Sequence, residues 1–164
     1  VGYNFPDAIG VAPLACAKQW PVLLTDQATG PLHPSAAQAL SELRITKALK
    51  VGTYVDLPDG VTGLANLSGA DRYFTNANVA LWARDHGGSA FGHTAFATGD
   101  KFPDALASGP YLARDRGILL LSPLYGPVPG SIMNVLGANG GAVQKLSFIA
   151  CIEPVVGQVQ GLLP

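Results

Sequence analysis

The sequence repeats itself, and this repeat constrains the fold more than any other feature of the chain. The residues FPDA at 5–8 recur at 102–105, which is 97 residues further on. The similarity runs without gaps from 1–25 onto 98–122 and weakens beyond these ranges. Internal repeats indicate equivalent structural units that pack against their neighbours. We therefore expect tandem units of about 97 residues, of which 164 residues hold fewer than two.

The register of the repeat divides the chain into two parts. Residues 1–63 correspond to the C-terminal part of a first repeat, and residues 64–164 form a second repeat. We expect both parts to pack as one compact unit. The strand equivalent to 94–97 would precede residue 2, so the first repeat is expected to begin without it.

Short apolar runs alternate with helical patterns in both parts. Strands are predicted at 20–25, 48–55, 63–67, 93–97, 118–121 and 146–152, and helices at 36–43, 71–86, 103–114 and 129–136. The helix at 71–86 begins with Asp71 as a capping residue and ends at Gly87 and Gly88. Residues 155–164 are apolar but show no regular pattern. Alternation of strands and helices predicts an α/β fold, with a parallel sheet covered by helices on both faces.

Charge and hydropathy exclude several classes of protein. Charged residues make up 13% of the chain, the net charge is −1 and the mean hydropathy is +0.28. A nucleic-acid partner is not expected, because its binding relies on a strongly basic surface. Glycine, proline or charged residues interrupt every apolar run before the roughly 18 residues that a membrane span needs. Cys16 and Cys151 either are buried small residues or form a disulfide.

Catalytic and metal-binding motifs are absent from the sequence. It contains no G-x-S-x-G, G-x-G-x-x-G, P-loop or H-E-x-x-H pattern, and the three histidines show no ligand spacing. We therefore predict no enzyme activity, no metal site and no cofactor. A pair of carboxylates for glycoside cleavage remains open, with the candidates Asp7, Glu42, Asp71, Asp100, Asp104 and Glu153.

Three segments resemble the signatures of one known family, the type 2 cell-wall-binding repeats. Residues 68–75 (SGADRYFT) resemble its opening R-x-x-G-x-D-R-Y-x-T signature, and 97–107 (ATGDKFPDALA) resemble its A-T-G-x-x-F-P-D-A-L-A signature. Residues 21–25 (PVLLT) resemble its P-I-L-L-T strand, although Ile118 replaces the proline in the second copy. The resemblance implies Rossmann-like α/β repeats on surface proteins of Gram-positive bacteria, usually in sets of three.

The resemblance also implies a function. It suggests a secreted, non-catalytic module at the cell wall or cell surface, which anchors an exported protein to an anionic secondary polymer. The partner would be a polysaccharide or a teichoic-acid-like polymer. The alternative is a structural repeat scaffold that self-associates, or packs on further repeats or a partner domain, without binding polymer. The high apolar fraction, 48% of residues, favours this alternative.

Candidate binding residues lie where strands are followed by helices. Ligands of α/β proteins bind at the carboxyl ends of strands, and the N-terminus of a helix attracts anions. Asp104 suits the first turn of its helix, and we expect Arg72 to pair with Asp71 or Asp104 unless it contacts the ligand. The side chains of 21–24 are expected in the sheet core, with the strand end exposed. The predicted ligand-binding residues are Pro21, Val22, Leu23, Leu24, Arg72, Thr98, Gly99, Lys101 and Asp104.

Overall fold

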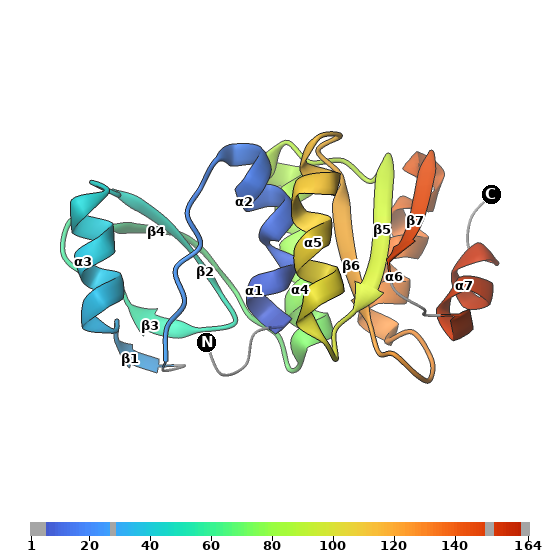
Figure 1. Ribbon diagram of the computed structural model, residues 1–164, viewed down its shortest axis with the longest axis horizontal. Helices are drawn as coiled ribbons and strands as arrows, with labels where there is room; N and C mark the ends of the chain where they lie inside the picture. The colour runs from blue at the N-terminus through green and yellow to red at the C-terminus, as the bar shows by residue number, and fades with distance from the viewer. Residues whose placement is uncertain (1–5, 27–28, 150–152, 162–164) are drawn as a thin grey trace.

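The computed structural model describes residues 6–26, 29–149 and 153–161 of the chain (Figure 1). The helices are α1 (Pro6–Gly10), α2 (Ala12–Lys18), α3 (Pro34–Glu42), α4 (Arg72–Trp82), α5 (Phe102–Ala113), α6 (Gly130–Asn139) and α7 (Glu153–Gln160), with short helical turns η1 (Ala83–Gly87) and η2 (Gly140–Ala142). The strands are β1 (Thr29–Pro31), β2 (Lys47–Val51), β3 (Tyr54–Asp56), β4 (Thr62–Leu67), β5 (His93–Thr98), β6 (Ile118–Ser122) and β7 (Lys145–Ile149). All strand pairs among these residues are parallel, as expected for an α/β protein.

The largest sheet has the strand order β6-β5-β7, with β5 in the centre. Every residue of β5 and β6 is buried. The predicted strands at 93–97 and 118–121 are therefore confirmed. A parallel strand covered on both faces needs apolar residues on both, which is why these two segments read as continuous apolar runs.

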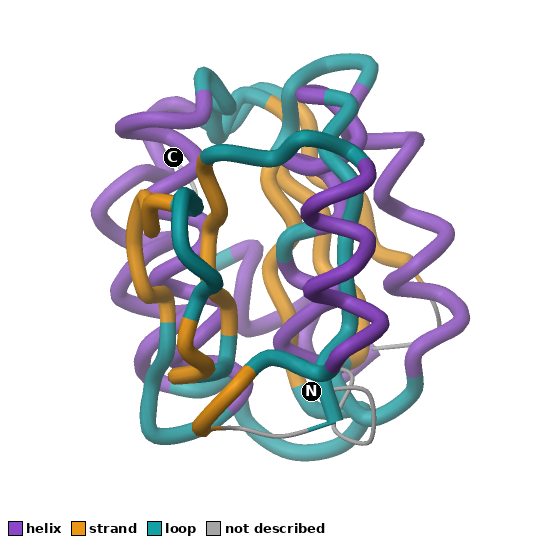
Figure 2. Tube along the Cα trace, turned by 90° about the vertical axis from the view of Figure 1, so that its left-hand side faces the viewer, coloured by secondary structure: helices purple, strands orange, loops and turns teal. Residues whose placement is uncertain are grey.

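Helices cover both faces of this sheet (Figures 1 and 2). Ala95 and Ala97 of β5 pack with Ala105 and Leu112 of α5 on one face. Phe96 points to the opposite face, where it joins buried side chains of α4 and α6. The alternation of side chains along β5 thus divides the core between two layers of helices.

Helix α4 begins and ends as its sequence predicts. The side chain of Asp71 accepts hydrogen bonds from the backbone N–H groups of Tyr73 and Phe74, at 2.9 and 2.7 Å. The helix continues as a single π-helical turn, η1, and stops at Gly88, whose φ of 74° favours glycine. These two signals confirm the predicted limits of the helical segment.

The N-terminal part contains two small parallel pairs, β2-β4 and β1-β3. The predicted strand at 48–55 is wrong as a single strand. Gly52 has a φ of 62° and turns the chain, so that β2 and β3 belong to different sheets. The expected boundary between residues 63 and 64 falls inside β4, which pairs with β2.

The predicted strand at 20–25 is also wrong. Residues 20–25 form an irregular segment that leads from α2 towards β1. No described strand pairs with this segment, and a short apolar run cannot form a strand without a neighbour to share its backbone hydrogen bonds. The apolar composition of the segment was therefore insufficient to predict its conformation.

The C-terminal end of the described chain is more regular than expected. Residues 153–160 form α7, although residues 155–164 show no regular pattern in the sequence. Val155 and Val159 are four residues apart and fully buried in the main core, so the helix presents one apolar face. Pro154 lies in the first turn, where proline is well tolerated, and core packing outweighs the low helix propensity of Gly157. None of the described helices is long and apolar enough to cross a membrane.

Candidate functional site

The candidate site lies at the carboxyl end of β5, where the chain turns into α5. Thr98 is buried, and its hydroxyl accepts a hydrogen bond from the backbone N–H of Asp100 at 3.1 Å. The N–H of Gly99 donates to the carbonyl of Ser122 at 2.8 Å, next to the end of β6. Thr98 and Gly99 therefore shape the turn. We call residues 98–101 the strand-end turn.

Arg72 reaches the strand-end turn from the first residue of α4. Its Nη1 donates a hydrogen bond to the carbonyl of Gly99 at 2.6 Å. The expected pairing with Asp71 or Asp104 is wrong, since no ion pair among the described residues involves Arg72. A Cβ atom at Gly99 would lie 3.1 Å from the ring of Tyr73 and 3.3 Å from Arg72 Cδ, so this close approach favours glycine.

Asp100 and Tyr73 complete the support of the turn, and neither was among the predicted site residues. The Tyr73 hydroxyl donates to Asp100 Oδ1 at 3.3 Å, and the N–H of Leu124 donates to Asp100 Oδ2 at 2.8 Å. Burial and the nearby charge of Asp100 raise the pKa of Tyr73 to about 12. Both residues lie within the two signature motifs, which was the signal that could have found them.

Lys101 and Asp104 are exposed beside this framework. Lys101 is the N-cap residue of α5 in an extended conformation, and Asp104 lies in the first turn of the helix. Neither side chain has a hydrogen bond or ion pair with another described residue, so both can contact a ligand. Arg72, Lys101 and the helix N-terminus offer positive charge, while Asp100 and Asp104 offer acceptors. This mixture suits a ligand with both anionic and hydroxyl groups.

The other predicted residues, Pro21–Leu24, lie at a separate place. They form one wall of a groove of about 460 Å³, which none of residues 98–104 lines. Val22 is 46% exposed and Leu24 is 54% exposed, so the expectation that these side chains form sheet core is wrong. The reason is again the absence of a described strand beside them.

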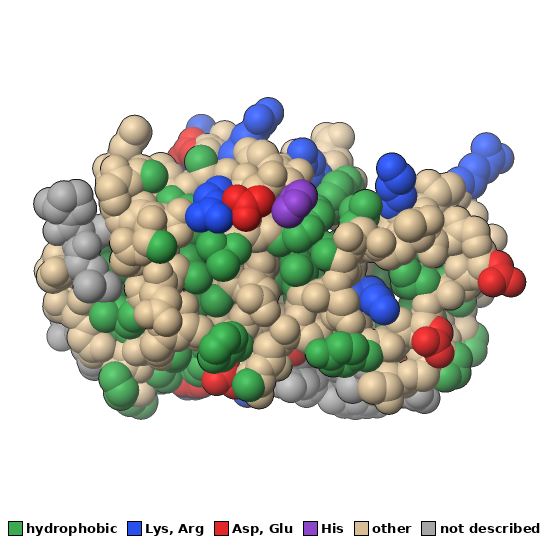
Figure 3. Space-filling view, turned by 180° about the vertical axis from the view of Figure 1, so that it is seen from behind, with side chains coloured by type: hydrophobic (Ala, Val, Ile, Leu, Met, Phe, Trp, Pro, Cys, Tyr) green, Lys and Arg blue, Asp and Glu red, His purple; other side chains and the backbone are tan. Residues whose placement is uncertain are grey.

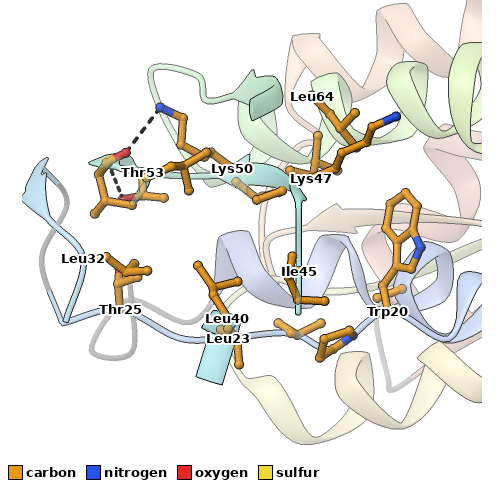
Figure 4. A pocket seen from close by; sticks show the side chains of 18 of the residues that line it. Trp20, Leu23, Thr25, Leu32, Leu40, Ile45, Lys47, Lys50, Thr53 and Leu64 are labelled. Carbon is orange, nitrogen blue, oxygen red and sulfur yellow. Dashed lines mark hydrogen bonds between the residues drawn. The ribbon is translucent and has the colours of Figure 1, made fainter. Parts of the chain in front are cut away.

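The groove separates this segment from β2 (Figure 4). Figure 3 shows the surface hollowed beside Lys and Arg side chains on this half of the molecule. Leu23 and Leu40 lie on one side, and Lys47 and Lys50 of β2 lie on the other. Lys50 Nζ donates to the carbonyl of Val55 at 3.3 Å. The charged residues that line the groove are all cationic, namely Arg44, Lys47 and Lys50. None of these three residues was among the candidates predicted from the sequence.

A polar network at the opposite end of the sheet involves His93. Its Nδ1 lies 2.8 Å from Asp115 Oδ2, and its Nε2 lies 3.1 Å from Ser147 Oγ, which is also 3.2 Å from the Tyr111 hydroxyl. The order of groups is that of a hydrolase triad, but the His93 side chain is 4% exposed and lines no described pocket. The network joins β5, β7 and the end of α5, which makes His93 a packed histidine.

Potential metal ligands do not cluster within residues 6–26, 29–149 and 153–161. No group of three or more His, Cys, Asp or Glu side chains there could hold a metal ion. Cys16 is exposed, which corrects the view of it as a buried small residue, and it has no disulfide within the part of the chain that is described. Cys151 lies outside the described residues.

Residues 66–148, which contain the whole strand-end turn, match the family Cell wall binding domain 2 (CWB2). This match spans half of the chain. The chain belongs to the CWB2 family. The resemblance noted in the sequence is thereby confirmed, and the family name indicates a binding domain at the cell wall.

Two solved structures share the fold of this CWB2 chain. Cwp6 from Clostridium difficile superposes with a TM-score of 0.71 at 19% sequence identity, over 96% of this chain and 26% of that chain. Cwp8 from the same organism gives 0.64 at 20% identity, over 98% and 27%. This chain therefore spans about a quarter of the length of either protein. No curated protein sequence matches it.

Proposed function

We propose that this CWB2 chain is a non-catalytic module that anchors an exported protein to an anionic secondary polymer of the Gram-positive cell wall. One observation carries the proposal: the family match at 66–148 contains every residue of the strand-end turn and its supports. The ligand would be a polysaccharide or a teichoic-acid-like polymer. The protein would act outside the cell, at the wall or surface.

The strand-end turn supplies the contacts in this proposal. Lys101 and the N-terminus of α5 attract a phosphate or carboxylate group. Arg72 donates a hydrogen bond to the carbonyl of Gly99, so it positions the turn and adds a positive charge next to it. Asp104 accepts hydrogen bonds from sugar hydroxyls. Each contact is weak, and a long polymer is retained because several contacts act together.

The two parts of the chain would be tandem, Rossmann-like repeats of about 97 residues, divided at 63 and 64. In this arrangement the end of residues 21–25 is the first repeat's counterpart of the end of β6. Pro21–Leu24 would then contribute polymer contacts through the backbone at the strand end. Pro21, Val22 and Leu24 are exposed, so a ligand can reach this segment.

Co-sedimentation with Gram-positive cell walls tests the anchoring function. Intact walls and walls stripped of secondary polymers by acid extraction are compared at low and moderate salt. We expect binding to intact walls only, and weaker binding as salt screens the exposed charges. Equal binding to stripped walls would contradict the proposal.

Variants locate the site within the same assay. Lys101→Ala should weaken binding about three- to tenfold, as expected for loss of one charge-assisted contact. Arg114→Ala removes an exposed cation just after the other end of α5 and is the matched control, for which we expect no change. An unchanged affinity of Lys101→Ala would move the polymer site away from the strand-end turn.

A scaffold without polymer binding is the second candidate function. The exposed apolar side chains of Val22 and Leu24 favour it, because apolar surface of this kind often lies against another protein. Sedimentation velocity of the chain over a range of concentrations tests it. A monomer at all concentrations that still binds intact walls would exclude self-association as the function.

A further inference from the structure

Tyr125 is the most exposed large apolar side chain among the described residues. It is 79% exposed and lies in the loop that joins β6 to α6. This loop and the strand-end turn lie at the same end of the central sheet (Figure 1). Because so little of its surface is buried, the ring contributes almost nothing to the packing of the fold. Its flat face is open to a ligand.

The loop that carries this ring is held at both ends. Before the ring, the backbone N–H of Leu124 donates to Asp100 Oδ2 at 2.8 Å. After it, the N–H of Val128 donates to the side chain of Gln158 at 2.9 Å, and Val128 is buried. Three of the seven residues 123–129 are prolines, which fix the backbone further. The ring is therefore exposed on a restrained backbone, so stacking on a ligand costs little conformational entropy.

The hydrogen bond to Asp100 places the ring close to the exposed cation of the strand-end turn. Lys101 directly follows Asp100, and Tyr125 directly follows Leu124. Since consecutive Cα atoms are about 3.8 Å apart, the Cα atoms of Lys101 and Tyr125 lie within about 15 Å of each other. One sugar ring with its anionic group, together with the two side chains, can span this distance.

We propose that a pyranose ring stacks on Tyr125 while its anionic group contacts Lys101 and the N-terminus of α5. The inference rests on the proposed function and narrows its ligand to an anionic polysaccharide with the charged group on, or next to, a sugar ring. One face of a pyranose presents C–H groups, whose partial positive charge is attracted to the face of an aromatic ring. A linear polyol phosphate, such as the backbone of a teichoic acid, has the anion but no ring for Tyr125.

The first copy of the repeat carries neither group. In the 97-residue register Lys101 corresponds to Asn4, and Tyr125, just beyond the gapless range, corresponds to Ala28. The cation and the aromatic ring therefore occur together in the second copy, as two parts of one subsite. Both are needed to select a charged sugar over a charged polyol.

Two small phosphates test the ligand class directly. Glucose 6-phosphate is a pyranose, whereas sorbitol 6-phosphate has the same carbon number and phosphate in an open chain. Each is titrated into the isotope-labelled chain, and amide shifts are followed by NMR. We expect glucose 6-phosphate to bind about three- to tenfold more tightly, with shifts at 98–101 and 124–126, and Tyr125→Ala to abolish the preference. Equal affinities, or no binding of glucose 6-phosphate, would overturn the proposal.

Tyrosine variants test the same contact with intact walls. Tyr125→Ala removes the ring and should weaken co-sedimentation about three- to tenfold, whereas Tyr125→Phe keeps the ring and should bind like the wild type. Tyr54→Ala removes a side chain that is 60% exposed on β3, so it is the matched control and should leave binding unchanged. The midpoint of thermal unfolding of Tyr125→Ala should equal that of the wild type, which separates lost binding from lost folding. Wild-type wall binding by Tyr125→Ala would contradict stacking.

The outcomes separate this inference from the anchoring function. If Lys101→Ala weakens wall binding and Tyr125→Ala does not, the anchoring function stands and the sugar contact through Tyr125 is excluded. If the wild-type chain binds no walls, anchoring fails, and the two phosphates still decide whether the subsite recognises a sugar ring. Weaker wall binding by both variants, together with a preference for glucose 6-phosphate, supports both proposals.

Discussion

Arg72 and Tyr73 are consecutive residues of α4 that hold a turn belonging to another strand. Arg72 donates to Gly99, and Tyr73 donates to Asp100, each across 27 positions of sequence. Asp71, just before them, caps the helix that carries both. Three adjacent residues of one signature motif therefore position the residues of the other. At the residue scale, hydrogen bonds between the two motifs therefore hold the strand-end turn in place.

The pKa of Tyr73 predicts a loss of stability at high pH. It is about 12 in the folded protein, compared with about 10 for an unfolded tyrosine. The neutral phenol therefore stabilises the fold fully below pH 10, and this contribution disappears as the pH rises from 10 to 12. Tyr73→Phe cannot ionise. We expect the free energy of unfolding of the wild type, relative to this variant, to fall as the pH rises from about 10 to about 12 in urea titrations.

An absorbance titration provides an independent check of the same group. Subtracting the phenolate absorbance of Tyr73→Phe from that of the wild type leaves the absorbance change that is due to ionisation of Tyr73. Its ionisation should fall near pH 12. An ionisation near pH 10 would mean that Tyr73 is neither buried nor close to Asp100.

The N-cap of α4 gives a second prediction at this scale. Asp71→Ala removes the acceptor for two N–H groups at the start of the helix. We expect a loss of about 1 kcal/mol in the free energy of unfolding. Asp59→Ala removes an exposed carboxylate from a loop and should change stability by less than about 0.5 kcal/mol. Equal effects of the two variants would contradict the capping role.

At the scale of elements, a side chain acts as the neighbour of β6. β5 pairs with one edge of β6, and Asn76 of α4 satisfies the other. Asn76 Nδ2 donates to the carbonyl of Leu119 at 3.0 Å, and Leu121 N–H donates to Asn76 Oδ1 at 2.8 Å. The amide mimics a strand, because it pairs with one buried carbonyl and one buried N–H on the outer edge of β6.

Asn76→Ala should therefore be strongly destabilising. The variant leaves one buried carbonyl and one buried N–H without a partner, and each such group costs about 1–3 kcal/mol. We expect the free energy of unfolding to fall by about 2–4 kcal/mol in chemical denaturation. Asn134→Ala, at an exposed position of α6, is the control and should have little effect. A loss below about 1 kcal/mol for Asn76→Ala would show that water replaces the amide.

At the scale of the whole molecule, the two parts share their cores. Val11 and Leu14 of the N-terminal part belong to the same buried cluster as Phe96 and Leu120 of the central sheet. Ile9 joins the cluster on the other face. Helix α2 packs along α5, and β4 pairs with β2. This sharing predicts that the parts unfold together.

Leu14→Ala tests the cooperativity. Leu14 is buried, and its truncation should cost about 2–5 kcal/mol. We expect one unfolding transition, monitored by tryptophan fluorescence and by far-ultraviolet circular dichroism, and the variant should shift both signals equally. Separate transitions, with only the earlier one affected, would show that the parts are independent.

The sequence by itself determined the α/β class, the two buried strands at 93–97 and 118–121, and the limits of the helix after Asp71. These features depend on local signals: continuous apolar runs, a capping carboxylate, and glycines that stop a helix. The motifs also placed Arg72, Thr98, Gly99 and Lys101 together, because strand ends and helix starts meet at one edge of a parallel sheet.

Only the tertiary structure decided which apolar runs are covered. Residues 21–25 and 118–122 have similar sequences, but only the second has β5 beside it. The structure also assigned Arg72 to a carbonyl and joined Tyr73 to Asp100. The physical reason is that a strand, a buried side chain or an ion partner is completed by residues distant in the chain. A local pattern shows that a segment needs burial, a neighbouring strand or an ion partner. Tertiary packing determines whether that contact is present.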